Sequence, residues 1–277
     1  MIVDYHTHTS LCKHAQGNAE DYIRRAIGLG LSQIGCSEHI PMPDNFDEKH
    51  RMSIGEYYGT YAPQVTELRE KYRDDIIVRR GIEADFFPGT EPWVGGFIKE
   101  NEFDYVIGSV HFLGTWGFDD VVFVHRYVEN DVDRVYEQYF EAVKKSAQSG
   151  LFDIIGHCDL VKKFGHRPTK NLGDIIRETM KAIRSNDLCI EINTSGLRKP
   201  VKEMYPSEQI LEIARELRIP LTLGSDAHAP EDVARDFDKA IQLIDYYGDG
   251  SIATFDRRDR AMVPVSRLVH GGHQRPT

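Results

Sequence analysis

Short apolar runs recur along the chain, and segments with apolar residues at helical spacing separate them. Runs of roughly four to eight residues rich in β-branched side chains predict buried strands, whereas apolar residues three and four apart predict amphipathic helices. The sequence therefore predicts strands at 2–9, 31–36, 75–82, 104–110, 152–156, 189–193 and 220–224. Helices are predicted at 19–29, 53–72, 91–101, 131–149, 172–185, 207–217 and 231–247, and a small extra strand at 121–124.

Strands that alternate with helices in this way favour a parallel α/β sheet, either closed as a barrel or open and doubly wound. No glycine-rich fingerprint follows the first predicted strand, which argues against a dinucleotide-binding fold. We find neither a Pro/Ser-rich linker nor an internal repeat that would divide the chain. The expected architecture is a distorted (βα)7 TIM-like barrel formed as one domain by residues 1–277, with a frayed polar tail from about 265 to 277.

The composition is that of a soluble globular protein, since 40% of the 277 residues are hydrophobic and 28% are charged. The formal net charge of −10 argues against a surface that coats nucleic acid. We see no secretory signal, and no apolar stretch approaches the roughly 20 residues that span a bilayer. The four cysteines lack CxxC spacing, which is typical of reduced thiols. We expect a cytoplasmic protein without a nucleic-acid or membrane partner, and the sequence leaves its oligomeric state open.

Side chains that can bind metal ions stand where the predicted strands end. His6 and His8 follow the first apolar run, and residues two apart on a strand point to the same face. Asp4 has the same parity and could accept a hydrogen bond from the second ring nitrogen of a ligand. In an α/β barrel the carboxyl ends of all strands share one face, so further candidates join this pair. They are His14 in the first loop, His39, Glu83, His111, His157, Asp226 and His228.

These nine residues have the chemistry of a metal centre at the C-terminal ends of the strands. Neutral imidazoles and carboxylates suit zinc, iron and manganese, and the absence of cysteine ligands argues against a purely structural zinc site. Nine ligands are too many for one ion, but they suit two or three divalent ions that share a bridging carboxylate, for which Glu83 is the candidate. The other histidines fall in predicted loops or the tail and are expected to be solvated: His50, His125, His166, His270 and His273.

Six motifs, in this order, make the chain resemble the PHP family of polymerase and histidinol phosphatase domains. They are Asp4-Tyr5-His6-Thr7-His8-Thr9, Ser37-Glu38-His39, Gly81-Ile82-Glu83, Gly108-Ser109-Val110-His111, Gly156-His157-Cys158-Asp159 and Gly224-Ser225-Asp226-Ala227-His228. Within the family, Cys12-Lys13-His14-Ala15 resembles the histidinol-phosphate phosphatase branch. The resemblance implies a distorted (βα)7 barrel around a trinuclear centre. It implies three ligand groups, namely His6, His8, Glu83 and Asp226; Glu83, His111 and His157; and His14, His39 and His228.

By this resemblance we expect a histidinol-phosphatase of histidine biosynthesis, which hydrolyses L-histidinol phosphate to L-histidinol and phosphate. Three divalent ions carry about +6 against about −2 from Glu83 and Asp226, so the site would attract a phosphate dianion. The expected nucleophile is a hydroxide that bridges two ions and attacks phosphorus in line. The proton for the leaving alkoxide would come from Asp226, His228 or metal-bound water, and these two residues with Glu83 are the predicted catalytic groups.

Basic residues after two of the strands are candidates for binding the phosphate of the substrate. Arg198 follows one strand end, and arginine suits bidentate contact with phosphate. Another strand end is followed by Lys162, Lys163 and Arg167. Asp159, beside them, is expected either to orient a ligand or to cap local structure. The loops 41–52 and 114–125 could supply a carboxylate or aromatic neighbours to the histidinol moiety.

Two alternatives stay open at this point. One is a phosphoesterase of the same family that acts on nucleotides or phosphotyrosine. Nucleic acid itself is disfavoured, because the net charge is −10 and the chain shows no basic aromatic platform. The other alternative is a metal-binding module without catalysis, against which the completeness of the ligand set argues. Metal content together with hydrolysis of any phosphoester would separate these alternatives.

Overall fold

A computed structural model describes residues 1–267, and its main sheet contains seven parallel strands. In spatial order they are β1 (Val3–Asp4), β2 (Gln33–Cys36), β3 (Ile77–Asp85), β4 (Tyr105–Ser109), β7 (Ile154–Ile155), β8 (Cys189–Asn193) and β9 (Leu221–Gly224). The first and last strands also meet, since the Tyr5 backbone N donates to Leu223 O at 3.1 Å and Thr7 bridges Ala227. The sheet is a nearly closed barrel, and the predicted fold class is confirmed.

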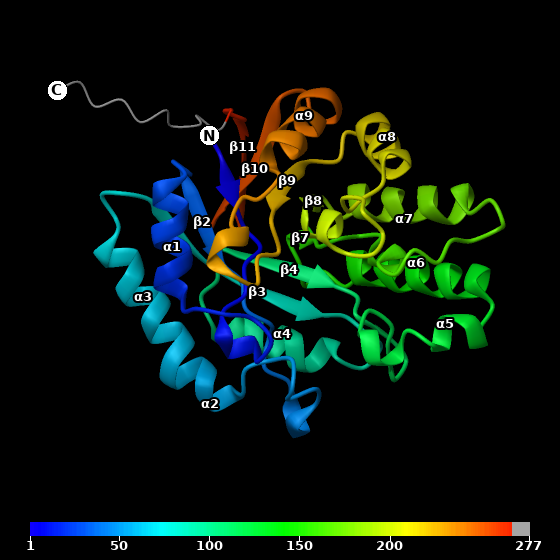
Figure 1. Ribbon diagram of the computed structural model, residues 1–277, viewed down its shortest axis with the longest axis horizontal. Coiled ribbons are helices and arrows are strands. Elements are labelled where there is room, and N and C mark those ends of the chain that lie inside the picture. The colour runs from blue at the N-terminus through cyan, green and yellow to red at the C-terminus, as the bar shows by residue number, and fades with distance from the viewer. Residues whose placement is uncertain (268–277) are drawn as a thin grey trace.

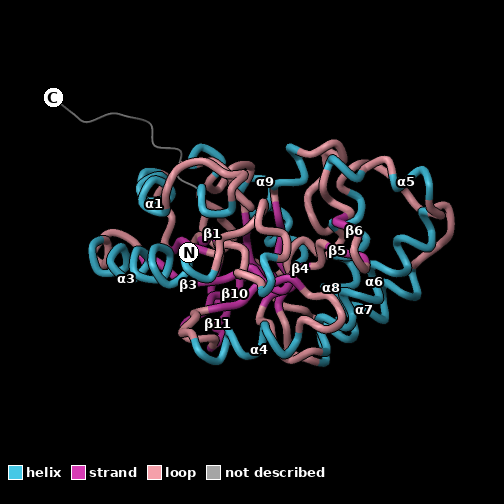
Figure 2. Tube along the Cα trace, turned by 90° about the horizontal axis from the view of Figure 1, so that it is seen from below, coloured by secondary structure: helices cyan, strands magenta, loops and turns pink. Residues whose placement is uncertain are grey.

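Helices surround these strands on the outside, as Figures 1 and 2 show. The seven longer ones are α1 (Ala19–Gly28), α3 (Ala62–Lys71), α4 (Glu91–Glu100), α6 (Val132–Gln148), α7 (Gly173–Ser185), α8 (Glu208–Leu217) and α9 (Phe237–Tyr247). Two short ones are α2 (Ile54–Glu56) and α5 (Arg126–Glu129). Each of the longer helices follows a barrel strand in the chain, so every βα connection returns the chain to the next strand and leaves its carboxyl end on the same face.

The local sequence explains where these helices start. At α1, the Asn18 side chain accepts hydrogen bonds from the amides of Glu20 and Asp21, and the Asp21 carboxylate accepts from the Asn18 amide in return. This capping box satisfies amides that would otherwise lack a partner in the first turn. The helix then buries Tyr22, Ile23 and Ala26 against the barrel. Its end is marked by Gly30, whose φ of 72° suits glycine.

Aromatic residues fill the amino-terminal end of the barrel. The Tyr105 hydroxyl donates to Tyr5 O at 2.6 Å, and both rings contact Phe255. Gly35 and Gly81 make room for Tyr105, because a Cβ at either position would overlap its ring or hydroxyl. This end of the barrel is therefore packed shut, and the open end is the one at the carboxyl termini of the strands.

Several predicted elements differ from the structure. Residues 121–124, predicted as a small strand, form a 3-10 helix at Val121–Phe123 because Asp120 caps the Val122 amide. The predicted helix 53–72 contains a π-helical segment at Tyr57–Tyr61. Two hairpins were not predicted: β5 (Phe112–Leu113) with β6 (Trp116–Gly117), and β10 (Ser251–Asp256) with β11 (Asp259–Pro264).

Two residues at the start of the expected frayed tail are bonded to the rest of the chain. The Val265 amide donates to Gly250 O at 2.9 Å, and the Ser266 side chain accepts from the amino terminus of Met1. Figure 1 shows the amino terminus beside β11. The remainder of that prediction, 268–277, lies outside the described residues. Within the described residues, no helix is both long enough and apolar enough to cross a membrane.

Candidate metal centre

Glu83, near the end of β3, lies at the middle of the histidine cluster. Its Oε2 is 2.9 Å from His39 Nδ1 and 3.4 Å from the Nε2 atoms of both His6 and His8. These residues are placed by three neighbouring strands, because His6 and His8 follow β1 and His39 follows β2. The bridge between His39 and Glu83 continues the β2–β3 pairing, so strand pairing itself holds the carboxylate beside the imidazoles.

The other carboxylate oxygen of Glu83 faces a second pair of histidines. Its Oε1 is 3.0 Å from His157 Nε2 and 3.5 Å from His111 Nε2. His111 follows β4 and His157 follows β7, which are the next strands around the barrel. One carboxylate therefore faces ring nitrogens on two sides, as a carboxylate shared by two ions must.

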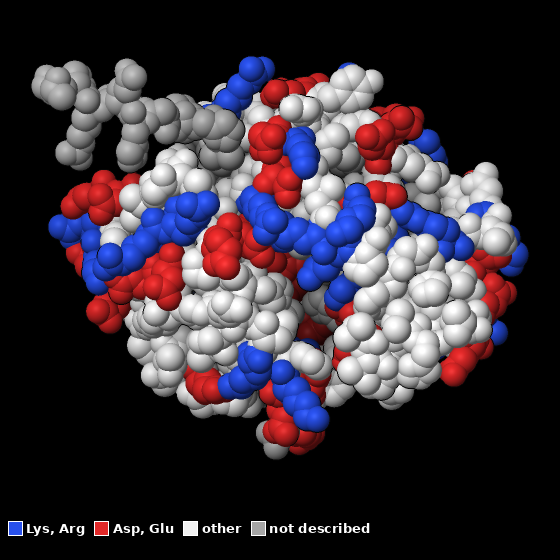
Figure 3. Space-filling view, viewed as in Figure 1, with Lys and Arg blue, Asp and Glu red and all other residues white. Residues whose placement is uncertain are grey.

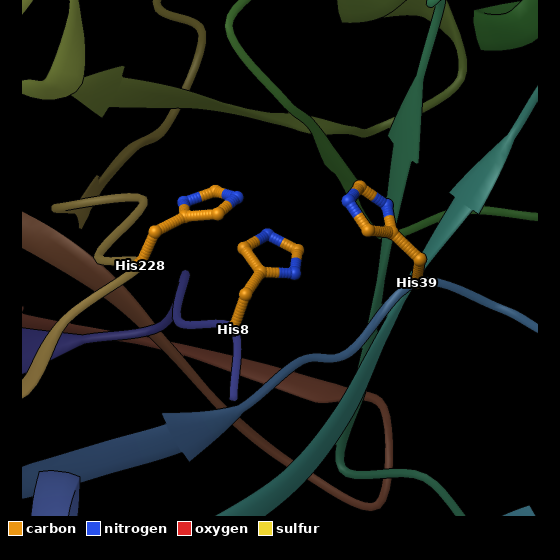
Figure 4. Close-up of side chains that lie close together, drawn as sticks. All are labelled: His8, His39 and His228. Carbon is orange, nitrogen blue, oxygen red and sulfur yellow. The ribbon is translucent and has the colours of Figure 1, made fainter. Parts of the chain in front are cut away.

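Asp226, after β9, closes the ring of candidates on the other side of β1. Its Oδ1 is 3.5 Å from His8 Nε2 and 3.5 Å from His228 Nδ1. The His228 Nε2 in turn lies 3.0 Å from His14 Nε2. Figure 4 shows His8, His39 and His228 projecting from separate segments toward one another. The structure thus brings all nine predicted residues into one cluster, and their role as ligands stays a prediction.

The buried polar atoms of this cluster fit metal ions. Among the described residues, three buried atoms that face one another in the middle of the cluster have no hydrogen-bond partner: His6 Nε2, His8 Nε2 and Glu83 Oε2. Buried polar atoms are normally paired, because leaving one unpaired costs about 1–3 kcal/mol. Imidazole nitrogens and carboxylate oxygens that converge in this way suit zinc, iron or manganese.

Charge in the cluster favours ionised carboxylates. Burial opposes ionisation of Glu83, but the charges of His6, His39 and His111 outweigh it and hold the pKa of Glu83 well below its usual range. Burial likewise opposes ionisation of Asp226, and the neighbouring histidines again lower its pKa. A bound cation would act in the same direction as these charges. Both carboxylates are therefore in the form that can coordinate a metal.

The backbone is strained at two of the strand ends. Asp226 has a φ of 49° and His157 a φ of 22°, in the left-handed region that favours glycine. Such conformations cost of order 1–3 kcal/mol and persist where the surrounding structure enforces them. At Asp226 the enforcing contacts include the Ala227 amide, which donates to His6 O at 3.3 Å. This backbone conformation directs the side chains of Asp226 and His157 into the cluster.

Two buried carboxylates that the sequence did not single out hold the histidines from behind. Glu191 in β8 accepts from His6 Nδ1 at 2.7 Å, and its other oxygen accepts from the His157 amide at 3.0 Å. Asp85, two residues beyond Glu83, accepts from His111 Nδ1 at 2.7 Å. A carboxylate on the second ring nitrogen fixes the tautomer and orientation of a ligating histidine. A glutamate inside the apolar run 189–193 was the available sequence signal for Glu191.

The structure corrects the interpretation of Asp4. Its carboxylate accepts from the Ser225 amide at 2.9 Å, the Ser225 hydroxyl at 2.6 Å and the Ala234 amide at 2.9 Å. Asp4 thus supports the segment after β9 and does not bond the ring of a candidate ligand. Asp159 accepts from the Ser207 amide and pairs with Lys162, both at 2.8 Å, so it caps local structure.

A cavity of about 720 Å³ opens over the cluster. Figure 3 shows a hollow near the middle of this face, with Lys and Arg side chains above and below it. Of the four basic residues predicted to bind substrate, Lys163 lines this cavity. Its Nζ bonds Asp119 Oδ2 at 3.0 Å. Lys199, which was not predicted, also lines the cavity and forms no ion pair with any residue the structure describes. Burial lowers the pKa of Lys199.

The other three basic candidates do not line this cavity. Arg198 turns back to the chain, where its Nη2 donates to Ser225 O at 2.7 Å. Lys162 and Arg167 line a separate cavity of about 310 Å³ and pair with Glu203. The strand-end position of these residues was predicted, but the direction of long side chains depends on distant partners. Their substrate-binding role therefore lacks geometric support.

Comparison with known proteins places this geometry in a family. The sequence model of the family described as PHP domain matches residues 4–195, which carry most of the cluster. The chain belongs to the PHP domain family. A protein of Deinococcus radiodurans with the name probable histidinol-phosphatase is 41% identical over 263 residues, covering 95% of this chain and 99% of that protein. The predicted family is thus confirmed.

Two solved structures have the same fold. HisK of Listeria monocytogenes superposes with a TM-score of 0.78 at 26% identity, covering 86% of this chain and 99% of that one. Histidinol phosphate phosphatase of Lactococcus lactis superposes with a TM-score of 0.76 at 24% identity, covering 94% and 98%. That second structure is a complex with zinc, L-histidinol and phosphate.

Proposed function

We propose that this PHP protein is a metal-dependent phosphomonoesterase that hydrolyses L-histidinol phosphate to L-histidinol and phosphate. The observation that carries the proposal is the 41% identity to a probable histidinol-phosphatase, which extends over nearly the full length of both chains. The complex of the Lactococcus lactis enzyme with L-histidinol and phosphate supports the same substrate class. A small-molecule phosphate ester also suits a cavity of about 720 Å³ that is lined by three lysines.

The proposed ligands are the nine clustered residues, and two to three divalent ions would satisfy them. His6, His8, Glu83 and Asp226 would hold one ion, Glu83, His111 and His157 a second, and His14, His39 and His228 a third. The contacts of Glu83 with His6 on one side and His157 on the other support the first two groups, and the distance of 3.0 Å between His228 Nε2 and His14 Nε2 supports the third. Zinc in the Lactococcus lactis structure supports a zinc enzyme. Ions so held polarise phosphoryl oxygens and make water acidic enough to act as a nucleophile near neutral pH.

The chain's own residues would then bind the substrate and transfer the proton that the leaving alkoxide needs. Lys163 and Lys199 supply positive charge at the cavity wall, where a phosphate dianion would lie. Asp226 Oδ2 accepts from the Ser195 hydroxyl at 3.1 Å, so Ser195 orients this carboxylate at the base of the cavity. Asp226 or His228 would take a proton from the attacking water and pass it to the departing alkoxide of L-histidinol, because the ionised Asp226 carboxylate holds no proton of its own. These two residues and Glu83 are the proposed catalytic groups.

The proposal is tested by measuring kcat/KM for L-histidinol phosphate beside a nucleoside monophosphate, phosphotyrosine and p-nitrophenyl phosphate. We expect a clear preference for L-histidinol phosphate, which Asp226→Asn abolishes without unfolding the protein. The exposed variant Glu216→Gln is the matched control and should behave as the wild type. Equal or better turnover of a nucleotide or of phosphotyrosine would refute the substrate, and metal binding without any turnover would refute the enzyme.

A further inference from the structure

Arg51 is a buried arginine that connects two parts of the candidate site. It lies on the loop between β2 and α2, and only 3% of it is exposed. On one side its Nη1 donates to Asp85 Oδ2 at 2.8 Å and to Ile40 O at 3.1 Å. On the other side its Nη2 donates to Asp47 Oδ2 at 2.9 Å. One guanidinium thus contacts both the barrel and the loop above it.

The barrel side of these contacts leads to the metal centre. Asp85 is 1% exposed, and its second oxygen accepts from His111 Nδ1 at 2.7 Å. The opposite ring nitrogen of His111 faces Glu83 Oε1 at 3.5 Å. Ile40, whose carbonyl Arg51 also holds, directly follows His39. Only the Asp85 side chain therefore separates Arg51 from His111, and Arg51 also bonds the backbone of the residue that follows His39.

The loop side of the contacts leads to the cavity wall. Asp47, His50 and Arg51 all line the cavity over the cluster. Asp47 Oδ1 is bonded to His50 Nδ1 at 2.7 Å, so the same carboxylate holds both the guanidinium and the imidazole. The loop residues that face the cavity are consequently linked to His111 by an unbroken series of charged hydrogen bonds. Charge-assisted bonds of this kind are about twice as strong as neutral ones.

We propose that Arg51 is a positioning residue that couples the metal centre to the wall of the substrate cavity. Through Asp85 it fixes the orientation of His111, and through Asp47 it fixes the loop 46–51. Metal binding at His111 and ordering of this loop then favour each other, because coupling between two sites is reciprocal. The inference rests on the proposed metal centre, but it does not depend on which phosphate ester is the substrate.

The test measures zinc affinity by competition with a chromophoric chelator, and amide hydrogen exchange over 46–51 with and without zinc. In the wild type, zinc should slow exchange in this loop. Arg51→Gln should weaken zinc binding about tenfold or more, within the range found for partners that orient metal ligands. Zinc should no longer protect the loop in this variant. Neither measurement uses a substrate, so both results are independent of whether the proposed phosphatase activity is correct.

Three further variants separate positioning from simple charge balance. Arg51→Lys keeps the positive charge but lacks the fork that spans Asp85 and Asp47, and it should fail to restore the coupling. Asp47→Asn should abolish protection of the loop by zinc and weaken zinc binding less than Arg51→Gln does, because the contact between Arg51 and Asp85 remains. The control is Arg258→Gln. This substitution breaks the ion pair of a partly buried arginine with Asp153 at the closed end of the barrel.

Three results would overturn the inference. The first is restoration of both zinc affinity and loop protection by Arg51→Lys, because charge alone would then account for the role of Arg51. The second is an equal loss of both properties in Arg258→Gln, which would show that they follow general stability. Normal zinc binding with unchanged loop protection in Arg51→Gln would likewise exclude the coupling.

Discussion

Replacing Glu191 with glutamine should weaken zinc binding without unfolding the barrel. Glu191 is 1% exposed, and both of its oxygens accept hydrogen bonds. Oε1 accepts from His6 Nδ1 at 2.7 Å, while Oε2 accepts from the His157 amide at 3.0 Å and from Asn193 Nδ2 at 3.1 Å. Glutamine has nearly the same shape but only one acceptor oxygen, so it can satisfy only one of these sides.

Either orientation of the new amide has a cost. If its oxygen faces His6, its NH2 group meets two donors, and each buried donor left unpaired costs about 1–3 kcal/mol. If its nitrogen faces His6, the His6 proton moves to Nε2, the atom that faces Glu83 and Asp226. His6 then cannot coordinate a metal through that atom. Loss of such an orienting partner weakens metal binding about 10–100-fold, which corresponds to about 1.4–2.7 kcal/mol.

The assay is a competition titration with a chromophoric chelator, accompanied by circular dichroism to verify folding. The matched control is Asp153→Asn, since Asp153 accepts from the Val106 amide at 2.8 Å at the opposite end of β7. This control should lower the unfolding temperature and leave zinc affinity unchanged. The reasoning is refuted if folded Glu191→Gln binds zinc within about twofold of the wild type, or if Asp153→Asn loses affinity equally.

Two further predictions concern the cavity and the barrel. Lys199→Ala should weaken inhibition by inorganic phosphate about tenfold, the equivalent of one charged contact of about 1.4 kcal/mol. Because burial lowers the pKa of Lys199, wild-type affinity for phosphate should fall as the pH rises through that pKa, earlier than for an ordinary lysine, and Lys199→Arg should move this decline upward. An unchanged pH dependence in Lys199→Arg would exclude Lys199 as the group. Gly35→Ala should lower the free energy of unfolding by about 1–3 kcal/mol, because its methyl group would overlap the Tyr105 hydroxyl. Gly28→Ala, in open space on α1, is the thermal-denaturation control and should cause no loss.

The clustered residues could be predicted because their signals are local. All but His14, which lies in the first loop, stand at or shortly after the end of an apolar strand, and parallel βα units bring all such ends to one face whatever the details of packing. Lys199, Glu191 and the Arg51–Asp85 pair escaped prediction for the opposite reason. Their roles depend on where a side chain points after residues far apart in sequence have packed, and neither spacing nor composition records that direction.

The hairpin of β10 and β11 was missed because its turn lacks the usual residues. Two-residue hairpin turns normally contain Asn-Gly or Asp-Gly, since both positions require positive φ. Here Arg257 and Arg258 occupy the turn with φ values of 48° and 69°. Tertiary contacts enforce this conformation, because the Arg257 and Arg258 amides both donate to Asp104. A turn that is stabilised by contacts with a distant residue cannot be predicted from its own two residues.

The central claim is that the nine clustered residues hold the metal ions on which phosphatase activity depends. The most direct test removes metal with a chelator, restores zinc in measured equivalents, and follows phosphate release from L-histidinol phosphate. We predict no activity in the metal-free protein, and recovery that saturates at two to three equivalents of zinc per chain. The phosphatase activity of Asp226→Asn should not recover at any amount of added zinc. Full activity in protein verified to be free of metal, or recovery complete at far less than one equivalent, would contradict the account.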